Sequence, residues 1–517
     1  MTTTVMCSTC GTRNRAAMGH CRRCKAPLSG NALGASETVR GTPTSNLIDE
    51  RWTLIGQAPG MSQGWWRGRD VASGQPVHIR MISSEQHRGD PVQLLDLARR
   101  RQDIESPGLM SVLAVTTNDS GVVMIMSHRA GAALGQVLAD RRGLPMPVAL
   151  HFFESIVAGA ETLHEHGLVH GNLSPETIWI DQEGGAGMPT ALVAGGVRPR
   201  QPQAVAADYR GAALALAAML LGSDYAPSMP AGAIIGSAIE RVRWRCGTEV
   251  APRLQELFDV LVRADGSAPH RRRDEIGDAI GRLGADVDWS MMPVPRGPFL
   301  RGSDDGDRRA RPEEKPSAMI DLGAFFVDRT PVTAGEYWQF LNAAGRNPPM
   351  GWKRHNDPIN APDLPVVFVN WEEAREYARW VGKRLPTEAE WEKAARGTDG
   401  RTYPWGNEPP EERFAWYGDK EGPEIVGERR LGQSMYGVCD MAGNVFEWVA
   451  DWFDADYYAL APMSSPRGPL MGTKRVLRGG SFSHSAFALR CAARGRYDPR
   501  ARRANHSFRC VWSLHEP

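Results

Sequence analysis

The spacing of apolar residues changes along the chain and marks segments with different structures. Between about residues 48 and 127, short apolar runs such as WTLIGQ, QPVHIRMIS and GVVMIMSHRA predict strands, and VQLLDLARRRQDI has helical spacing. Between residues 147 and 222, apolar residues recur at helical intervals and predict two long helices, the second apolar enough for a core. Strands followed by helices favour an α+β domain.

The pattern after about residue 286 is different. This segment holds most of the sixteen tryptophans and many glycines and prolines, with short helical stretches at Thr333–Ala344 and Asn370–Gly382. Thr387 precedes a third stretch and Glu390 follows three residues later, which predicts a capping box. Long irregular loops need aromatic anchors, metals or internal hydrogen bonds to stay ordered. We therefore expect a loop-rich domain built around aromatic side chains.

The first residues carry a metal-binding pattern. Four of the eight cysteines have the spacing C-x2-C-x10-C-x2-C: Cys7, Cys10, Cys21 and Cys24. Two tight turns of this kind close a tetrahedral thiolate site that suits zinc and has no open position for catalysis. The spacing predicts a structural zinc ribbon over residues 1–27, the alternative being a disordered tail with redox thiols. The small polar residues at 28–47 predict a flexible linker.

Bulk properties limit the class of protein. A length of 517 residues predicts three or four domains, and a net charge of +1 gives no global field for nucleic acid or membrane. The apolar run Gly211–Gly222 is too short to span a bilayer, and the N-terminus lacks the build of a secretion signal. These features predict a cytoplasmic protein that binds neither nucleic acid nor membrane.

The segment at 48–285 contains Val77-His78-Ile79-Arg80 and GLVHGNLSPETIWI (Gly167–Ile180). With these motifs it resembles the protein kinase family, which has Val-Ala-Ile-Lys at the first position and its catalytic loop at the second. VAGGV (Val193–Val197) lies where Asp-Phe-Gly is expected. Asp96 lies in the helix that would carry the acid pairing with the lysine, and Asp208 resembles a buried structural acid of the family. The resemblance implies a bilobal kinase-like fold.

The charged groups of phosphoryl transfer are replaced. The reaction needs a lysine on the phosphates, a carboxylate base, and metal-holding Asn and Asp. Arg80 replaces the lysine, Asn172 the base, Thr177 the metal-binding Asn, and Ala194 lies at the metal-binding Asp. We therefore expect a pseudokinase that docks a protein partner, with ATP not expected; nucleotide binding without transfer is the alternative. The retained positions would be structural: Leu173, Pro175 and Asp208.

The segment at 286–517 contains the motifs LPVVFVNWEEAREYARWVGKRLPTEAEWEKAARG, YPWGN, YGVCDMAGNVFEWVADWF, RVLRGGSF and SFRC. With these motifs it resembles the formylglycine-generating enzyme (sulfatase-modifying factor) family. It implies a C-type-lectin-like fold. Four positions match a calcium site of the family, with two carboxylates and two backbone carbonyls: Asp440, Gly443, Val445 and Glu447. Local pairing of Glu447 is the alternative to calcium.

The metal chemistry of that family is not apparent here. Its oxidase reaction uses copper on two thiolates just after the Gly-Gly-Ser, but the stretch between Ser481 and Arg490 contains no cysteine. Cys491 and Cys510 match structural positions of the family. An iron site of the related sulfoxide synthases would need a histidine-rich motif, whereas LNAAGRNPPMGWKRHND has only His355. We therefore expect no copper and a chain that is not an enzyme.

The lining after Gly-Gly-Ser predicts a binding surface. Aromatic anchors and arginines are usual at recognition sites, the alternative being arginines that pair within the domain. The candidate ligand-binding residues are Phe482, Ser483, His484, Ser485, Phe487, Arg490, Arg494, Tyr497, Asp498, Asn505 and His506. A Gly-Gly-Ser followed by such a lining also resembles the variable proteins of diversity-generating retroelements, whose codons change at adenines.

Three functions are compatible with these patterns. The first is a non-catalytic multidomain α+β protein whose C-terminal domain binds a protein or small ligand while the kinase-like domain and zinc ribbon dock partners. The second is a formylglycine-type oxidase acting on cysteine of a protein. The third is nucleic-acid binding through the arginine-rich end, which the near-neutral net charge argues against.

Overall fold

The computed structural model describes most of the chain beyond residue 46. The described residues are 4–6, 13–15, 47–59, 61–83, 90–119, 121–139, 141–184, 187–246, 250–263, 269–285, 291–348, 352 and 359–514. Residues 1–45 form one unit and residues 46–517 a second. In the first unit, β1 (Thr4–Met6) pairs antiparallel with β2 (Arg13–Arg15). The four cysteines predicted to bind zinc (Cys7, Cys10, Cys21 and Cys24), the linker up to residue 46, and His355 lie outside the described residues.

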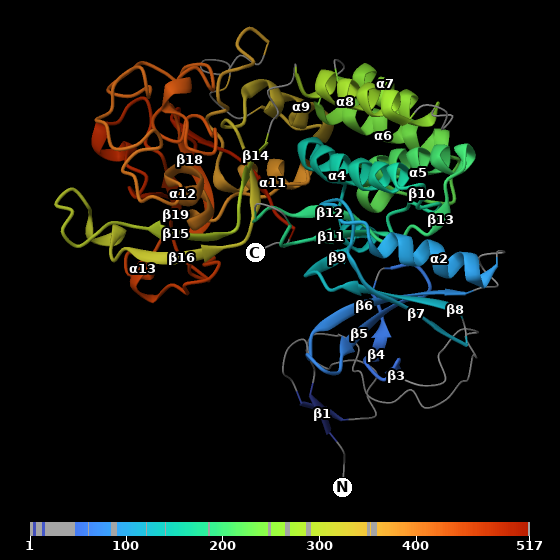
Figure 1. Cartoon of the computed structure of the whole chain (residues 1–517). Coiled ribbons are helices and arrows are strands. Elements are labelled where there is room, and N and C mark those ends of the chain that lie inside the picture. Colours follow the sequence, from blue (N-terminus) through green and yellow to red (C-terminus); the bar gives the residue numbers. More distant parts are fainter. Residues whose placement is uncertain are drawn as a thin grey trace. The chain divides into compact units, whose positions relative to one another are not determined.

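The second unit begins with a small lobe built on a six-stranded sheet in the order β3-β4-β5-β6-β8-β7 (Figure 1). Helix α2 packs on β7 and β8, with Asp90 accepting a hydrogen bond from the amide of Val92 as N-cap. The elements are β3 (Leu47–Ile48), β4 (Trp52–Gln57), β5 (Trp65–Asp70), β6 (Pro76–Ser83), α2 (Pro91–Gln102), β7 (Val112–Asn118) and β8 (Gly121–Ser127). This is the predicted order of strands with one helix.

A helical lobe follows, drawn in cyan to green in Figure 1. Helices α4 and α5 form its core, against which α6, α7 and α8 pack. The elements are β9 (Gly131–Ala133), α3 (Leu134–Ala139), α4 (Met146–Glu165), β10 (Leu168–Val169), β11 (Ile178–Asp181), β12 (Thr190–Val193), β13 (Arg198–Pro199), α5 (Pro202–Leu221), η2 (Gly222–Asp224), α6 (Ala231–Cys246), α7 (Val250–Val262) and α8 (Pro269–Ala285).

Helix α5 is the apolar helix that the sequence predicts. The stretch Pro202–Asp224 is long and apolar enough to cross a membrane by length and composition, but 78% of its apolar window is buried inside the structure. Its burial against α4, α6 and α7 is that of a core helix. Gly222 ends the helix with φ 62°, in the left-handed region that glycine tolerates.

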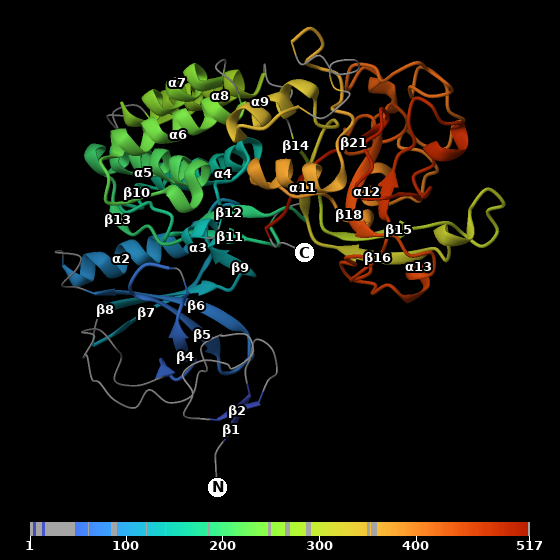
Figure 2. The same ribbon diagram turned by 180° about the vertical axis from the view of Figure 1, so that it is seen from behind.

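The C-terminal domain is rich in loops around short strands and helices, as Figure 2 shows from behind. Its elements are β14 (Met291–Val294), β15 (Gly297–Arg301), η3 (Pro312–Glu314), β16 (Ala318–Leu322), β17 (Phe325–Asp328), α9 (Ala334–Ala344), α11 (Trp371–Trp380), α12 (Glu388–Arg396), η4 (Arg430–Gly432), β18 (Phe446–Trp452), α13 (Tyr457–Leu460), β19 (Arg475–Arg478), η5 (Ala486–Leu489), β20 (Gly495–Tyr497), β21 (His506–Phe508) and β22 (Val511–Trp512). The predicted capping box of Thr387 and Glu390 is confirmed at α12, and equivalent boxes begin α9 and α11.

Aromatic side chains hold this domain together, as its composition predicts. One cluster contains Trp352, Trp371 and Trp448 packed around Tyr337 and Phe508, while Trp391 lies in the other large cluster. The indole of Trp448 donates to the carbonyl of Val369 at 3.1 Å, so ring packing and a hydrogen bond fix the same loop.

The C-terminal and kinase-like domains share part of one core. Trp512 of β22 lies edge-on to Phe152 of α4, with ring centroids 6.0 Å apart, and Arg141 stacks over its indole. Arg141 also donates to the carbonyl of Leu514 at 2.7 Å. Residues 46–517 therefore form a single compact unit.

Candidate functional site: a cavity at the end of a four-stranded sheet

The candidate site lies at one end of the sheet β20-β19-β18-β21. Strands β18 and β21 are parallel, and Phe446 pairs with His506 in register. Since side chains alternate between the two faces of a strand, Phe446 and Trp448 share a face with their neighbours His506 and Phe508. Trp448 and Phe508 are core residues on that face, whereas Phe446 and His506 reach its open end.

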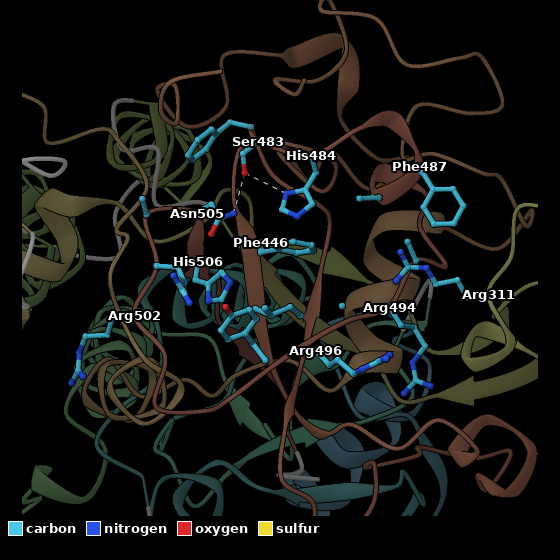
Figure 3. A pocket seen from close by; sticks show the side chains of 18 of the residues that line it. Arg311, Phe446, Ser483, His484, Phe487, Arg494, Arg496, Arg502, Asn505 and His506 are labelled. Atoms are coloured by element: carbon cyan, nitrogen blue, oxygen red, sulfur yellow. Dashed lines mark hydrogen bonds between the residues drawn. The ribbon is translucent and has the colours of Figure 1, made fainter. Parts of the chain in front are cut away.

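At this open end the structure has a cavity of about 750 Å3. Figure 3 shows that it is walled by the loop after the Gly-Gly-Ser turn and by the segment that leads into β21. Its lining residues are Arg311, Glu314, Phe368, Phe446, Leu477, Phe482, Ser483, His484, Phe487, Ala488, Ala493, Arg494, Gly495, Arg496, Tyr497, Arg502, Arg503, Ala504, Asn505 and His506. The size and mixed lining are typical of ligand sites.

The Gly-Gly-Ser turn positions the hydrogen-bonded polar side chains of the cavity. Gly480 has φ 73°, and a Cβ there would approach a Leu489 methyl carbon to 2.9 Å, so only glycine fits without strain. Ser481 follows this turn, and its hydroxyl lies 2.7 Å from Nδ1 of His484, a residue of the cavity lining. Asn505 donates to Ser483 at 3.1 Å (Figure 3). It also donates to Ser481 at 3.3 Å. Two distant segments are thereby joined by a polar network.

The floor of the cavity is aromatic and contains a buried imidazole. His506 is 3% exposed and lies edge-on to Tyr497 and Trp448, with ring centroids 4.9 and 5.2 Å away. Its Nδ1 has no hydrogen-bond partner among the described residues. Burial, with the charge of Arg503 and the neighbouring His484, lowers the pKa of His506 to about 3. The ring is therefore neutral at physiological pH.

The arginines divide into two groups. Arg490 and Arg494 are each 2% exposed. Arg490 donates twice to Glu314, at 2.7 and 2.8 Å, and Arg494 donates twice to Glu388, at 2.8 and 2.9 Å. For these two predicted ligand-binding residues the structure has the alternative arrangement, pairing within the domain, because each faces a buried carboxylate that needs a counter-charge.

The other predicted residues differ in their access to the cavity. Phe482, Ser483, His484, Phe487, Tyr497, Asn505 and His506 line it. Ser485 and Asp498 are exposed, and neither is among the lining residues. Phe487 is 38% exposed and stacks under Arg490 and Arg311, at 4.4 and 5.2 Å from the ring centroid. Ligand binding by all of these residues stays a prediction.

Several lining residues are not predictable from the sequence. Phe446, Leu477 and Phe368 read as core positions, and Arg311 precedes the Gly-Gly-Ser turn by more than 160 residues. The parallel pairing of β18 with β21 and the contact of Arg311 with Phe487 bring them to the cavity. Such long-range pairings have no local sequence signal.

The four predicted calcium positions lie at the start of β18. Glu447 is fully buried and accepts two hydrogen bonds from Arg509 at 2.7 Å and one from Trp391 at 2.8 Å. Asp440 accepts from the amide of Gly427 at 2.7 Å, and burial raises its pKa to about 6. No group of three or more His, Cys, Asp or Glu that could hold a metal occurs within the described ranges. Arg509 neutralises Glu447, so the donor set fits calcium poorly, and calcium with carbonyl ligands from Gly443 and Val445 stays a prediction.

The cysteines of the C-terminal domain have the structural character that the resemblance implies. Cys439, Cys491 and Cys510 are free and buried. Burial raises the pKa of all three thiols, that of Cys491 to about 12. Buried protonated thiols are inert rather than poised to bind a soft metal.

The kinase-like catalytic loop is held by Asp208. Its carboxylate accepts from the amides of His170 and Gly171, at 2.8 and 2.7 Å, and from Nε2 of His164 at 3.0 Å. Thr177 hydrogen-bonds inside the same loop, to the carbonyl of Asn172 at 3.0 Å. The loop is therefore fixed by local bonds, as expected for a structural Asp208.

The remaining kinase positions serve packing. Arg80 donates to the carbonyl of Gln63 and stacks on Trp65, and Asp96 is exposed. Ala194 is buried, and its carbonyl faces Nε2 of His170 at 2.9 Å. The neighbouring Gly195 carbonyl accepts from Arg101, a fully buried guanidinium of α2 that no sequence pattern singled out.

The region between the two lobes is filled by aromatic side chains. Trp179 of β11 is 5% exposed and lies edge-on to His78 of β6, with ring centroids 4.6 Å apart. His78 also stacks on His128 at 5.0 Å. Trp65 joins the same cluster with Ala194. These contacts join the lobes.

Comparison with known proteins agrees with both folds. The family described as Sulfatase-modifying factor enzyme 1-like domain matches residues 286–514, and the family described as Protein tyrosine and serine/threonine kinase matches residues 56–187. The formylglycine-generating enzyme of Thermomonospora curvata is 34% identical over 280 residues, which cover 43% of this chain and 92% of that protein. The chain belongs to the formylglycine-generating enzyme family, and a kinase-like domain precedes its family domain.

Two further likenesses are more limited. Serine/threonine-protein kinase pkn1 of Chlamydia caviae is 37% identical over 242 residues, which cover 43% of this chain. The chain spans about 37% of the length of that relative. The solved structure of Treponema denticola variable protein 1 is 24% identical, covers 43% of this chain and 94% of that one, and has a TM-score of 0.35. A TM-score this low supports no conclusion about function.

The prediction that the chain is not an enzyme is wrong, because the relatives it matches are named as enzymes, a serine/threonine-protein kinase and formylglycine-generating enzymes. The prediction relied on side chains missing from their usual positions. Missing ligands at those positions do not exclude chemistry by other groups in the same cavity.

Proposed function

We propose that the C-terminal domain recognises a segment of a protein in the cavity at the end of the sheet β20-β19-β18-β21. The observation that carries the proposal is a concave site of about 750 Å3 with aromatic walls and several guanidinium groups at its margin. Aromatic rings and arginines supply most of the binding energy at protein recognition sites. The hydrogen-bond network around Ser481 orders part of the lining before a ligand binds. Less conformational entropy is therefore lost on binding.

A panning experiment tests this proposal. The full chain is immobilised and challenged with a library of random short peptides, and the double variant Phe487→Ala/Tyr497→Ala is panned in parallel. Phe487 and Tyr497 line the cavity, so peptides enriched on the wild type should lose at least about tenfold in affinity for the variant. Thermal melting of the variant should match the wild type, since both side chains are partly exposed. Equal enrichment on the two proteins would reject the cavity as the binding site.

A second candidate function is generation of formylglycine on a bound cysteine-containing segment. The 34% identity to the Thermomonospora curvata enzyme over 92% of its length supports it. Its test is incubation of the full chain with a cysteine peptide, copper and dioxygen as the oxidant, followed by mass spectrometry of the peptide for formylglycine. Formylglycine produced by the wild type but not by the Phe487→Ala/Tyr497→Ala variant would establish this activity at the same cavity. An unchanged peptide in the wild type would reject it.

A further inference from the structure

The charges around the cavity are not balanced. Four of the arginines near it have carboxylate partners: Arg490 with Glu314, Arg494 with Glu388, Arg496 with Glu313 at 2.9 Å, and Arg502 with Glu373 at 2.7 Å. The first two pairs are buried, and the last two lie at the exposed margin. Within each pair the two charges neutralise each other. The positive charge available to a ligand therefore comes from the remaining lining arginines.

Those remaining arginines are Arg311 and Arg503. Both are exposed, and within the described parts of the chain no carboxylate lies at ion-pair distance from either guanidinium. Arg311 stacks over Phe487 at 5.2 Å and Arg503 over Tyr497 at 5.3 Å, so each is held against an aromatic wall of the cavity. Burial alone would raise the pKa of Glu313, but hydrogen bonds and the charges of Arg496 and Arg311 lower it. Arg496 pairs with this carboxylate at 2.9 Å, whereas Arg311 acts on it from beyond ion-pair distance.

The imidazole of His484 is also arranged as a hydrogen-bond donor toward the cavity. Ser481 accepts from Asn505 at 3.3 Å and from the amide of Ser483 at 3.4 Å, which uses both acceptor positions of its hydroxyl. Its proton is therefore donated, and Nδ1 of His484 at 2.7 Å is the nearest acceptor. With Nδ1 accepting, the neutral imidazole carries its proton on Nε2, the nitrogen that this ring can offer to a ligand.

The floor between these donors is apolar. Phe446 and Tyr497 lie edge-on to the neutral ring of His506, and Leu477 lines the same cavity. This imidazole is buried and uncharged, so an apolar side chain of a ligand that packs against it meets no charged group. Moving such a side chain from water onto the floor is therefore favourable. An apolar side chain therefore fits on the floor, and hydrogen-bond acceptors fit around it.

We propose that the cavity takes an acidic peptide segment in which Asp or Glu side chains flank an aromatic or aliphatic residue. The carboxylates would meet Arg311, Arg503 and Nε2–H of His484, and the apolar side chain would lie on Phe446 and Tyr497. This inference rests on the proposed function and adds the chemistry of the ligand. A single-stranded nucleic acid also offers anions and stacking rings. The net charge of +1 gives no general attraction for a long phosphate backbone.

The same peptide library tests this inference by the composition of the enriched sequences. Peptides bound to the full chain should be enriched in Asp and Glu beside an apolar residue. A synthesised acidic peptide should bind at least about tenfold more weakly to Arg311→Glu/Arg503→Glu than to the wild type, since each lost contact is a hydrogen bond between charged groups. Replacing its Asp and Glu by Asn and Gln should weaken binding to the wild type similarly. Arg379→Glu, an exposed arginine of α11 outside the cavity, is the control and should leave affinity unchanged.

The outcomes separate the two proposals. Neutral or basic peptides whose binding still requires Phe487 and Tyr497 would overturn the acidic ligand while keeping the proposed function. No enrichment relative to the Phe487→Ala/Tyr497→Ala variant would overturn both. A single-stranded oligonucleotide that displaces the peptide and binds more tightly would replace the acidic peptide by nucleic acid. Affinity unchanged in Arg311→Glu/Arg503→Glu would remove the arginines from recognition.

Discussion

Replacing Arg490 and Arg503 separately by methionine distinguishes a structural arginine from a ligand-binding one. Arg490 is 2% exposed and makes two hydrogen bonds to Glu314, which is itself fully buried. Arg490→Met leaves this carboxylate buried beside Ser303 without its cation. Breaking a buried ion pair from one side costs about 3–5 kcal/mol. For a domain of this size that corresponds to a melting temperature lower by about 6–20 °C.

Arg503→Met is the matched control, because it removes the same side chain from an exposed position that lacks a carboxylate partner among the described residues. Its effect on stability should stay within about 0.5 kcal/mol. Calorimetric melting of the full chain measures both variants, and Arg490→Met/Glu314→Leu should recover most of the loss, because it removes the unpaired charge. Equal melting temperatures for Arg490→Met and Arg503→Met would refute this reasoning and return Arg490 to the candidate ligand residues.

Further predictions concern other buried groups. Burial and the charge of Glu388 raise the pKa of Asp451 to about 8, so between about pH 4 and pH 8 the folded state keeps a proton that the unfolded chain loses. The free energy of unfolding should therefore fall with rising pH by up to about 1.4 kcal/mol per pH unit. Urea unfolding at several pH values should show a smaller pH dependence of this free energy for Asp451→Asn. An identical pH dependence in both proteins would contradict the raised pKa of Asp451. Trp179→Ala should destabilise the kinase-like domain by about 3–5 kcal/mol in thermal melts, whereas the less buried Trp66→Ala should cost less, because Trp179 joins the lobes. Elemental analysis should find zinc in the wild type that is lost in Cys7→Ser/Cys10→Ser, and equal zinc in both would reject the ribbon. Chelation of calcium should leave the melting temperature of the wild type unchanged, because Arg509 already neutralises Glu447, and a drop that Asp440→Asn does not show would restore the calcium site.

The sequence was informative where a structure depends on nearby residues. The capping box of Thr387 and Glu390 spans three positions, and the helical spacing of α4 and α5 is visible within one window. The role of Asp208 followed from the kinase resemblance, and its bonds to the amides of His170 and Gly171 show why an acid is needed there. Gly-Gly-Ser likewise identified the loop that walls the cavity.

The sequence did not predict ion pairs whose two residues lie far apart along the chain. Arg490 and Glu314 are separated by 176 residues, and Arg494 and Glu388 by 106, so no local pattern distinguishes these arginines from Arg503. The conclusion about catalysis failed for a related reason. It treated residues missing from known positions as decisive, whereas chemistry depends on which groups the fold brings together.

The buried ion pairs also distinguish positions of this segment that hold the fold from positions at its surface. Arg490 and Arg494 attach the variable-looking stretch Phe482–Tyr497 to η3 and α12 through buried carboxylates, and Arg509 attaches the end of β21 to Glu447 of β18. Ser485, before Arg490, and Asp498, between Arg494 and Arg509, are exposed, whereas Leu489, Cys491 and Phe508 in the same region are buried. A substitution at one of the exposed positions alters the surface of the domain, while a substitution at an attachment leaves a buried charge unpaired. The retroelement hypothesis therefore requires that any diversified codons fall on the exposed positions of this segment and never on the buried arginines.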